Sequence, residues 1–183
     1  MSDLQHGYGL FEDLYDKDTV NEINILLKSS ALDSGFDNPA DGVIKTSTVS
    51  MVRWSAVRFK LALLEDCIRV ANRKNFAYDI FPFDAHTVLH YNVYSKGNEY
   101  KWHRDGMTIK DPTDIKLTMI LNLSEEPYEG GELMLKVNVE DELVNLKSGD
   151  VVVFKPWLSH KVTPVTKGER MSLTTWVEGP KFR

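Results

Sequence analysis

Turn signals divide the second half of the chain into short β-prone runs, and this rhythm limits the possible fold more than any other feature. The signals are Lys96-Gly97-Asn98, Gly130-Gly131, Ser148-Gly149-Asp150 and Lys167-Gly168. The runs predict strands at Val88–Tyr94, Tyr100–His103, Lys116–Leu123, Glu132–Lys136, Glu142–Leu146, Asp150–Phe154, His160–Thr163 and Arg170–Val177. Many short strands separated by such turns are typical of an antiparallel sandwich or barrel.

The first part of the chain is predicted to be mainly helical. Asp18 is a candidate cap for a helix that runs to about Lys28, and a second helix is expected from about Ser55 to Asn72. Apolar residues recur at helical spacing: Val20, Ile23, Leu26 and Leu27 in the first helix, and Leu61, Leu64 and Ile68 in the second. A weakly alternating segment, Thr46–Val52, predicts one strand. Together these patterns favour a mostly β protein (α+β) with a jelly-roll core and N-terminal helices packed on it.

Length and composition limit the class of protein. The 183 residues favour one domain over 1–183, with a helical support region at 1–80 and the β core at 81–183. A net charge of −5 disfavours a nucleic-acid binder, because such proteins cluster Lys and Arg. The sequence has no long apolar run for a membrane, and residues 1–6 lack the features of a signal peptide. The single cysteine, Cys67, is expected to be buried and inert, and it favours a reducing cytoplasm.

His103-Arg104-Asp105 and the later His160 form a candidate metal site. Side chains two residues apart in an extended segment point to the same side, so His103 and Asp105 can reach one ion. Such a pair alone is weak evidence, since on a turn it is more often solvated. With His160, however, two imidazoles and one carboxylate match the facial triad of non-haem Fe(II) sites. His6 and His86 have no comparable framing.

Arg170 follows His160 after a segment that contains Pro164, Lys167 and Gly168 and is interpreted as a hairpin turn. Paired strands on either side of a hairpin place residues opposite one another, so the arginine is expected beside the metal. Alternation puts Ser172, Thr174 and Trp176 on the face of Arg170, and Met171, Leu173 and Val177 on the face toward the helices. A guanidinium beside a hydroxyl is suited to a carboxylate ligand. An arginine paired with an acidic neighbour on an exposed strand is the competing interpretation.

These pieces together resemble the Fe(II)/2-oxoglutarate-dependent oxygenases, and within them the prolyl and lysyl hydroxylase-like branch. The resemblance covers about the C-terminal half of the chain: residues 94–105, Leu121-Asn122-Leu123, Gly130-Gly131-Glu132-Leu133, Ser148-Gly149-Asp150, residues 160–165, residues 168–172 and Trp176. Lys45-Thr46-Ser47 and Trp54 resemble the family's N-terminal region more loosely. The resemblance implies a double-stranded β-helix with iron at the open end of the barrel.

The resemblance also implies roles for individual residues. His103, Asp105 and His160 would bind Fe(II), and Arg170 would pair with the distal carboxylate of 2-oxoglutarate. Further cosubstrate or pocket positions would be Ser172, Tyr94, Leu133 and Trp176, and His90 and Asn92 are candidate substrate contacts on the inward face of the Tyr94 strand. Two departures stand out. Ile120 replaces a tyrosine that the oxygen-sensing members use to bind the distal carboxylate, and Gly106 replaces an asparagine often found after the aspartate.

The implied reaction is hydroxylation of a C–H bond, with O2 as oxidant and oxidative decarboxylation of 2-oxoglutarate to succinate and CO2. Ascorbate is a candidate reductant. The preferred substrate is a prolyl residue of a protein or peptide, and the oligomeric state stays open. The alternatives are a hydroxylase of a free amino acid or other small metabolite, a nucleic-acid demethylase, and an inactive metal-binding interaction module. Two polar loops, Gly35–Val43 and Met107–Asp114, are predicted to border the substrate entrance as mobile lids.

Overall fold

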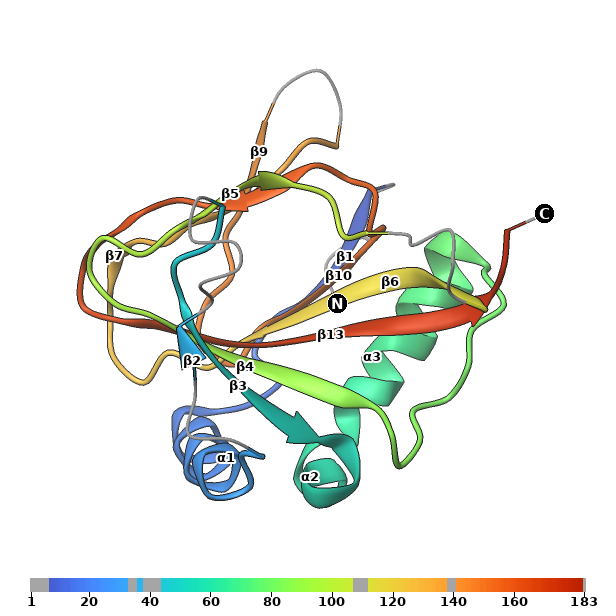
Figure 1. Ribbon diagram of the computed structural model, residues 1–183, viewed down its shortest axis with the longest axis horizontal. Coiled ribbons are helices and arrows are strands. Elements are labelled where there is room, and N and C mark those ends of the chain that lie inside the picture. The colour runs from blue at the N-terminus through green and yellow to red at the C-terminus, as the bar shows by residue number, and fades with distance from the viewer. Residues whose placement is uncertain (1–6, 33–35, 38–43, 107–111, 138–140, 183) are drawn as a thin grey trace.

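Two facing β-sheets with helices on one outer side form the structure (Figure 1). The computed structural model describes residues 7–32, 36–37, 44–106, 112–137 and 141–182. Within these residues the helices are α1 (Lys17–Ser29), α2 (Trp54–Leu61) and α3 (Leu63–Ala71), which continues into a π-helical turn, Asn72–Phe76. The strands are β1 (Tyr8–Phe11), β2 (Phe36–Asp37), β3 (Thr48–Arg53), β4 (Val88–Tyr94), β5 (Tyr100–His103), β6 (Thr113–Asn122), β7 (Glu129–Gly130), β8 (Leu133–Leu135), β9 (Glu142–Val144), β10 (Val151–Phe154), β11 (His160–Val162), β12 (Val165–Lys167) and β13 (Arg170–Pro180).

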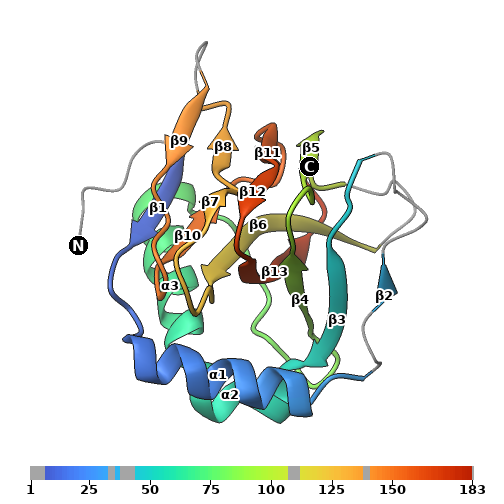
Figure 2. The same cartoon turned by 90° about the vertical axis from the view of Figure 1, so that its left-hand side faces the viewer.

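The major sheet has the strand order β1-β10-β6-β13-β4-β3-β2, and the minor sheet has the order β5-β11-β8-β9. Strands β12 and β7 form a separate short ribbon. All pairings between the described strands are antiparallel. Figure 2 shows the two sheets facing each other above the helices. This arrangement confirms the predicted jelly-roll core with an N-terminal helical layer.

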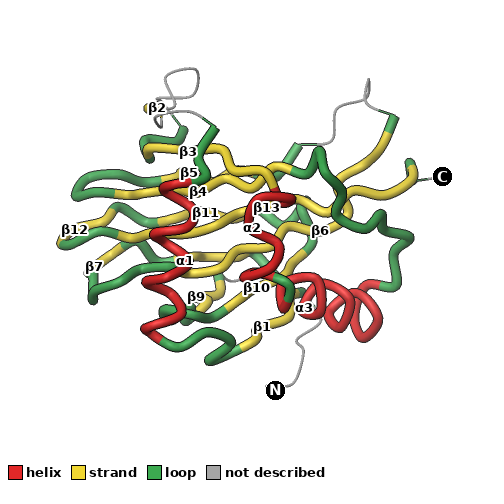
Figure 3. Tube along the Cα trace, turned by 90° about the horizontal axis from the view of Figure 1, so that it is seen from below, coloured by secondary structure: helices red, strands yellow, loops and turns green. Residues whose placement is uncertain are grey.

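The main hydrophobic core lies between the helices and the outer face of the major sheet. Figure 3 shows α1 and α2 running across the strands of that sheet. The core contains Val20, Ile23 and Leu27 of α1, Val57 and Leu61 of α2, and Leu64 and Ile68 of α3, packed with Leu117, Met119, Leu121, Leu173 and Val177 of the sheet. Cys67 is buried in this core, and burial raises the pKa of its thiol to about 12, which fits an inert structural cysteine.

Strand β10 shows why a continuous apolar run belongs in the middle of this fold. Val151 and Val153 pack in the helix-side core, whereas Val152 and Phe154 pack in a second core between the two sheets. Because the strand is covered on both faces, all four residues are buried. The second core also contains Ile120, Leu133 and Leu135.

Two helix predictions need correction. Asp16, not Asp18, caps α1, because its carboxylate accepts a hydrogen bond from the Thr19 amide at 2.8 Å. The long helix predicted over residues 55–72 is divided at Ala62 into α2 and α3. No Gly or Pro marks this break; α2 contacts β3 and α1, whereas α3 contacts β1 and β10, so each half follows different neighbours.

Each of the eight strands predicted in the second half overlaps a strand of the structure, and β4 and β5 have the predicted bounds. The ninth predicted strand, Thr46–Val52, overlaps β3. Strand β6 begins earlier and β13 ends later than predicted, because Thr113 pairs with Pro180 and carries the ladder outward. Strands β1, β2, β7 and β12 were not predicted, and all are too short to show a clear period. No helix in the described part of the chain is long and apolar enough to cross a membrane.

Candidate active site

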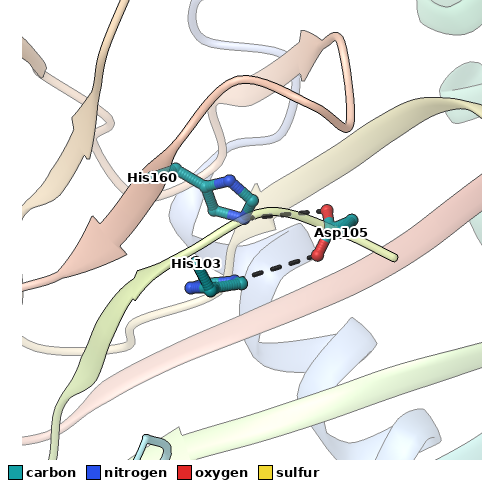
Figure 4. Close-up of side chains that lie close together, drawn as sticks. All are labelled: His103, Asp105 and His160. Carbon is teal, nitrogen blue, oxygen red and sulfur yellow. Dashed lines mark ion pairs between the residues drawn. The ribbon is translucent and has the colours of Figure 1, made fainter. Parts of the chain in front are cut away.

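The three predicted metal ligands converge between the two sheets (Figure 4). His103 ends β5 and His160 begins β11, and these two residues pair directly across the minor sheet. Asp105 follows β5, and its backbone amide donates to the carbonyl of Pro156 at 2.9 Å. One ligand atom from each of the three side chains lies within 4.8 Å of the others. The three residues of the predicted triad therefore form one cluster, close enough together to hold a single metal ion.

Backbone carbonyls orient both histidines. Nδ1 of His103 lies 2.7 Å from the carbonyl oxygen of Lys101, and Nδ1 of His160 lies 2.8 Å from that of Leu158. A carbonyl oxygen only accepts, so Nδ1 of each ring must be the donor, and in the neutral ring Nε2 then carries a free lone pair. The two Nε2 atoms lie 3.8 Å and 3.6 Å from the carboxylate oxygens of Asp105. This is how metal-binding histidines are held in protein sites.

The electrostatics of the site also suit a metal ion. Burial, followed by the neighbouring His160, lowers the pKa of His103 to about 4, so the ring is a neutral imidazole near pH 7. Nε2 of His103 is buried and has no hydrogen-bond partner among the described residues. Asp105 is oriented by Thr118, whose hydroxyl donates to the carboxylate. A divalent cation would satisfy the orphaned Nε2, and two imidazoles with one carboxylate suit Fe(II).

The triad faces a cavity of about 170 Å³ between the sheets. Besides the three ligands, its walls include the predicted residues Tyr94, Leu133, Arg170, Ser172, Trp176 and His90. Lys45, Tyr100, Thr118, Ile120, Val162 and Thr174 complete the wall. The cavity therefore brings together the predicted metal ligands and the predicted cosubstrate residues, although these lie far apart in the sequence.

Arg170 lines this cavity together with Lys45, and it is the more deeply buried of these two cations. Only 2% of its surface is exposed, and its Nη1 donates to the Ser172 hydroxyl at 3.0 Å. Its guanidinium carbon lies 5.2 Å from the centre of the Tyr94 ring. Among the described residues no carboxylate forms an ion pair with Arg170. A buried charge without a counter-charge is costly, so the cavity is built for an anionic ligand. The exposed, acid-paired arginine of the competing interpretation is wrong.

The hairpin predicted to pair the strands of His160 and Arg170 is not formed, although both residues do line the same cavity. Strand β11, which carries His160, pairs with β5 and β8 in the minor sheet. Strand β13, which carries Arg170, pairs with β4 and β6 in the major sheet. The residues between them include β12, which pairs with β7 rather than closing a hairpin. Arg170 reaches the metal site across the gap between the sheets, and the predicted alternation of Ser172, Thr174 and Trp176 is confirmed.

Close packing fixes the guanidinium. A Cβ added at Gly131 would lie 3.1 Å from Cδ of Arg170, and Gly131 has a φ of +64° that favours glycine.

Ile120 lies in the cavity wall, so the position of the expected tyrosine contributes an apolar surface here. Gly106 is exposed, and no atom of the described residues lies within 4 Å of where its Cβ would be. Ser172 and Tyr94 are the described polar neighbours of Arg170.

Lys45 is the functional candidate that the sequence did not reveal. It is 8% exposed, it lines the cavity, and its Nζ donates to Oδ1 of Asn92 at 2.7 Å. Its ammonium lies 5.1 Å from the centre of the Tyr100 ring, which in turn stacks on His103 at 3.5 Å. An isolated bridge between Lys45 and Tyr100 brings the lysine here. No local pattern predicts that bridge, so only a loose family resemblance marked this position.

His90 and Asn92 differ in their placement. His90 lines the cavity, and its ring meets Trp176 edge-on at 4.8 Å. Asn92 is buried and does not line the cavity; its amide donates to the His90 carbonyl at 2.9 Å and accepts from Lys45. Asn92 thus orients neighbours rather than facing ligand space. The predicted lids lie mostly outside the described residues, which include only Phe36–Asp37 of the first segment and 112–114 of the second.

Cavity size alone would not identify the site. A larger hollow of about 820 Å³ shares Arg170 and Leu133 with the catalytic cavity. Its walls contain Glu125, Glu126, Glu129 and Glu132 but none of the three metal ligands. Of these two spaces, the smaller one is the candidate active site, because it combines the three candidate metal ligands with Arg170.

Comparison with known proteins agrees with this geometry. The model of the 2OG-Fe(II) oxygenase superfamily matches residues 89–178, a range that contains His103, Asp105, His160 and Arg170. This part of the chain is therefore similar to the 2OG-Fe(II) oxygenase superfamily. The family name implies Fe(II), 2-oxoglutarate and O2, and the donor set and buried guanidinium described above fit the metal and the dicarboxylate.

Individual sequences and solved structures are also similar to this chain. A PKHD-type hydroxylase of Alteromonas mediterranea is 34% identical over 95 residues, which cover 48% of this chain and 42% of that protein. The chain thus matches less than half the length of this curated relative. A Pseudomonas putida prolyl-4-hydroxylase has a TM-score of 0.76 at 22% identity, covering 97% of this chain and 95% of that one. A Trichoplax adhaerens prolyl hydroxylase in complex with a hypoxia inducible factor peptide fragment has a TM-score of 0.72 at 16% identity, covering 94% and 84%. At these identities the two structures show that the chain shares their fold.

Proposed function

We propose that the chain is an Fe(II)- and 2-oxoglutarate-dependent dioxygenase that hydroxylates a prolyl residue of a protein or peptide. One observation carries the proposal: a complete His-Asp-His cluster faces the same small cavity as a buried arginine that has no acidic partner in the described part of the chain. A metal-binding module alone would need the cluster but not the arginine. An iron site that also takes a dicarboxylate needs both.

Each residue has a distinct role in this proposal. His103, Asp105 and His160 would hold Fe(II), which supplies the oxidative chemistry when it is bound. Arg170 and Ser172 bind and orient the distal carboxylate of 2-oxoglutarate, so that its other end points toward the triad. The apolar walls formed by Ile120, Leu133 and Val162 limit water in the cavity.

The preference for a prolyl substrate rests on similarity. Relatives and structural neighbours are described as PKHD-type hydroxylases and prolyl hydroxylases, and one of the latter is bound to a peptide. Because fold does not define substrate, the prolyl group is the part of the proposal most in need of a test. A reducing, cytoplasmic location also belongs to the proposal, since Cys67 is unpaired.

The nucleic-acid alternative loses support at one residue. Repair dioxygenases would be expected to carry a second arginine about six residues after the first, and Trp176 stands there. Trp176 lines the cavity and packs against His90 instead. The net charge of −5 also gives no general attraction for phosphates.

The test is to incubate the protein with Fe(II), ascorbate, 2-oxoglutarate and a library of proline-containing peptides. We expect succinate formation and a peptide product that has gained one oxygen atom on proline, detected by fragment mass spectrometry. The Asp105→Ala variant and a reaction without iron are the controls. Free proline and other free amino acids are assayed alongside, and hydroxylation of these alone would replace the peptide assignment. Absence of succinate under all conditions would contradict the enzyme assignment.

A further inference from the structure

A surface groove continues outward from the catalytic cavity. It has a volume of about 430 Å³ and is lined by the segment Phe81–Val88 together with Glu178 at the end of β13. His90 and Trp176 belong to the walls of both spaces. The edge-on pair of their rings, 4.8 Å apart, is therefore the boundary between cavity and groove. We call this space the rim groove.

The walls of the rim groove are held by hydrogen bonds. The Phe81 amide donates to the Glu178 carbonyl at 2.8 Å, which ties the segment to β13. The Asp84 carboxylate accepts from the amides of His86 at 2.8 Å and Thr87 at 2.9 Å and so closes a local turn. The Trp54 amide donates to the Thr87 carbonyl at 2.9 Å. A groove fixed in this way is present before a ligand binds.

The rim groove combines an exposed apolar side chain, Phe81, with negative charge. Phe81 is 45% exposed, and Phe83 beside it packs edge-on against Trp54. Asp84 and Glu178 supply two carboxylates, and none of the described residues lining the groove is Lys or Arg. The surface thus attracts a ligand with apolar parts and a positive charge.

An unused hydrogen-bond donor lies at the boundary with the cavity. Nε1 of Trp176 is buried and has no acceptor among the described residues. A buried donor left without a partner destabilises the protein, so a site for an acceptor from a ligand is expected beside it. A peptide carbonyl is such an acceptor.

We infer that the rim groove binds an extended segment of the substrate polypeptide with a cationic residue close to the hydroxylated one. This inference rests on the proposed function, because the groove is defined by its continuity with the catalytic cavity. In this inference the Trp176 indole donates to a backbone carbonyl of the substrate, and the Phe81 ring packs against the substrate chain. Asp84 and Glu178 face its cationic residue. An extended chain advances about 3.3 Å per residue, so a residue roughly two to four positions from the hydroxylated one reaches the acidic part.

The experiment measures binding, so that it does not depend on turnover. Two fluorescent, end-blocked peptides are used as probes: Lys-Gly-Ala-Pro-Ala-Gly-Lys and Glu-Gly-Ala-Pro-Ala-Gly-Glu. Their charges are symmetrical about proline, so the direction of the bound chain does not matter. Fluorescence anisotropy with the protein loaded with Mn(II) and 2-oxoglutarate should give at least about fivefold tighter binding of the lysine peptide at low ionic strength. Added salt should reduce the difference.

Variants locate the preference in the rim groove. Glu178→Gln and Asp84→Asn keep the shape and one acceptor oxygen but remove the charge, and each should reduce the ratio of the two affinities. Trp176→Phe should weaken both peptides by a similar factor because it removes the carbonyl donor. The controls are Glu22→Gln on α1 and Phe59→Ala on α2; Phe59 is 75% exposed, and neither residue lines the groove. These controls should leave both affinities unchanged.

Two outcomes would overturn the inference. One is equal binding of the two peptides, including no binding of either. The other is a lysine preference that Glu178→Gln and Asp84→Asn leave intact. Failure of the proposed function is seen separately, as absence of iron-dependent succinate formation from 2-oxoglutarate by the same protein preparation.

Discussion

At the scale of single residues, the proposed site rests on four side chains: three candidate metal ligands and one arginine. In the proposed site three side chains would hold the metal ion, and the Arg170 guanidinium would bind the cosubstrate in the same cavity. These four residues were found as candidates in the sequence: His103 and Asp105 share a short segment, His160 completes a facial triad with them, and Arg170 follows His160 after a predicted turn. The family resemblance then implied their roles. Lys45 was not predictable, because its place depends on a bridge to Tyr100, which is remote from it in the sequence.

The triad gives the first prediction. His103→Ala, Asp105→Ala and His160→Ala should each abolish iron-dependent succinate formation while leaving a folded protein, since each removes one of three protein ligands. Metal content, succinate yield and circular dichroism are measured on the same samples. Normal iron content and succinate formation in His160→Ala would remove that residue from the triad.

The support of Asp105 by Thr118 gives the second prediction. Thr118→Val keeps the shape of the side chain but removes the hydroxyl that donates to the Asp105 carboxylate. Loss of such a partner typically lowers metal affinity about 10- to 100-fold. Competition titration of Mn(II) measures the change, and Thr166→Val on the exposed part of β12 is the control. Equal metal affinity in both variants would show that the hydroxyl does not support the ligand.

At the scale of elements, the second-half strands were predictable because turns and alternation mark them directly. The helix boundaries were not. The α2–α3 break at Ala62 arises because the two helices pack on different strands, and nothing local signals it. The hairpin prediction was wrong for the same reason. The turn residues after His160 do not indicate that β11 and β13 belong to different sheets.

Adjacent leucines at the start of α3 test whether the helical layer supports the sheet without entering the site. Leu64 is fully buried in the main core, whereas Leu63 is 45% exposed. Leu64→Ala should lower the free energy of unfolding by about 2–5 kcal/mol, because it leaves a cavity. Leu63→Ala should change that energy by about 0.5 kcal/mol or less. Urea unfolding measures both, and 2-oxoglutarate affinity should stay at the wild-type value in each folded variant. A loss of affinity in Leu64→Ala alone would mean that α3 also shapes the cavity.

At the scale of the whole molecule, the two sheets bring together residues that are remote in sequence. The cavity joins Lys45, Tyr94, His103, Leu133 and Arg170. The general fold class was predictable from strand rhythm and the helical stripes. The facing of particular strands was not, because it is set by long-range packing of the two cores.

The shared core predicts that the protein unfolds as one unit. Residues of α1, α2 and α3 pack in the same cluster as residues of β6, β10 and β13, so the regions 1–80 and 81–183 cannot separate without exposing it. Scanning calorimetry should show a single transition in which calorimetric and van't Hoff enthalpies agree. Two resolved transitions would mean that the helical region and the β core are separate domains.

The central claim is that Arg170 holds the distal carboxylate of 2-oxoglutarate beside a metal triad. Calorimetric titration of 2-oxoglutarate into Mn(II)-loaded wild-type protein and Arg170→Ala tests it most directly. Truncating one partner of a buried charge pair costs about 2–5 kcal/mol. We therefore expect an affinity loss of roughly 30-fold to several thousand-fold with Mn(II) binding retained. Arg170→Lys should recover only part of the loss, because an ammonium lacks the planar fork. Wild-type affinity for 2-oxoglutarate in Arg170→Ala would contradict the claim.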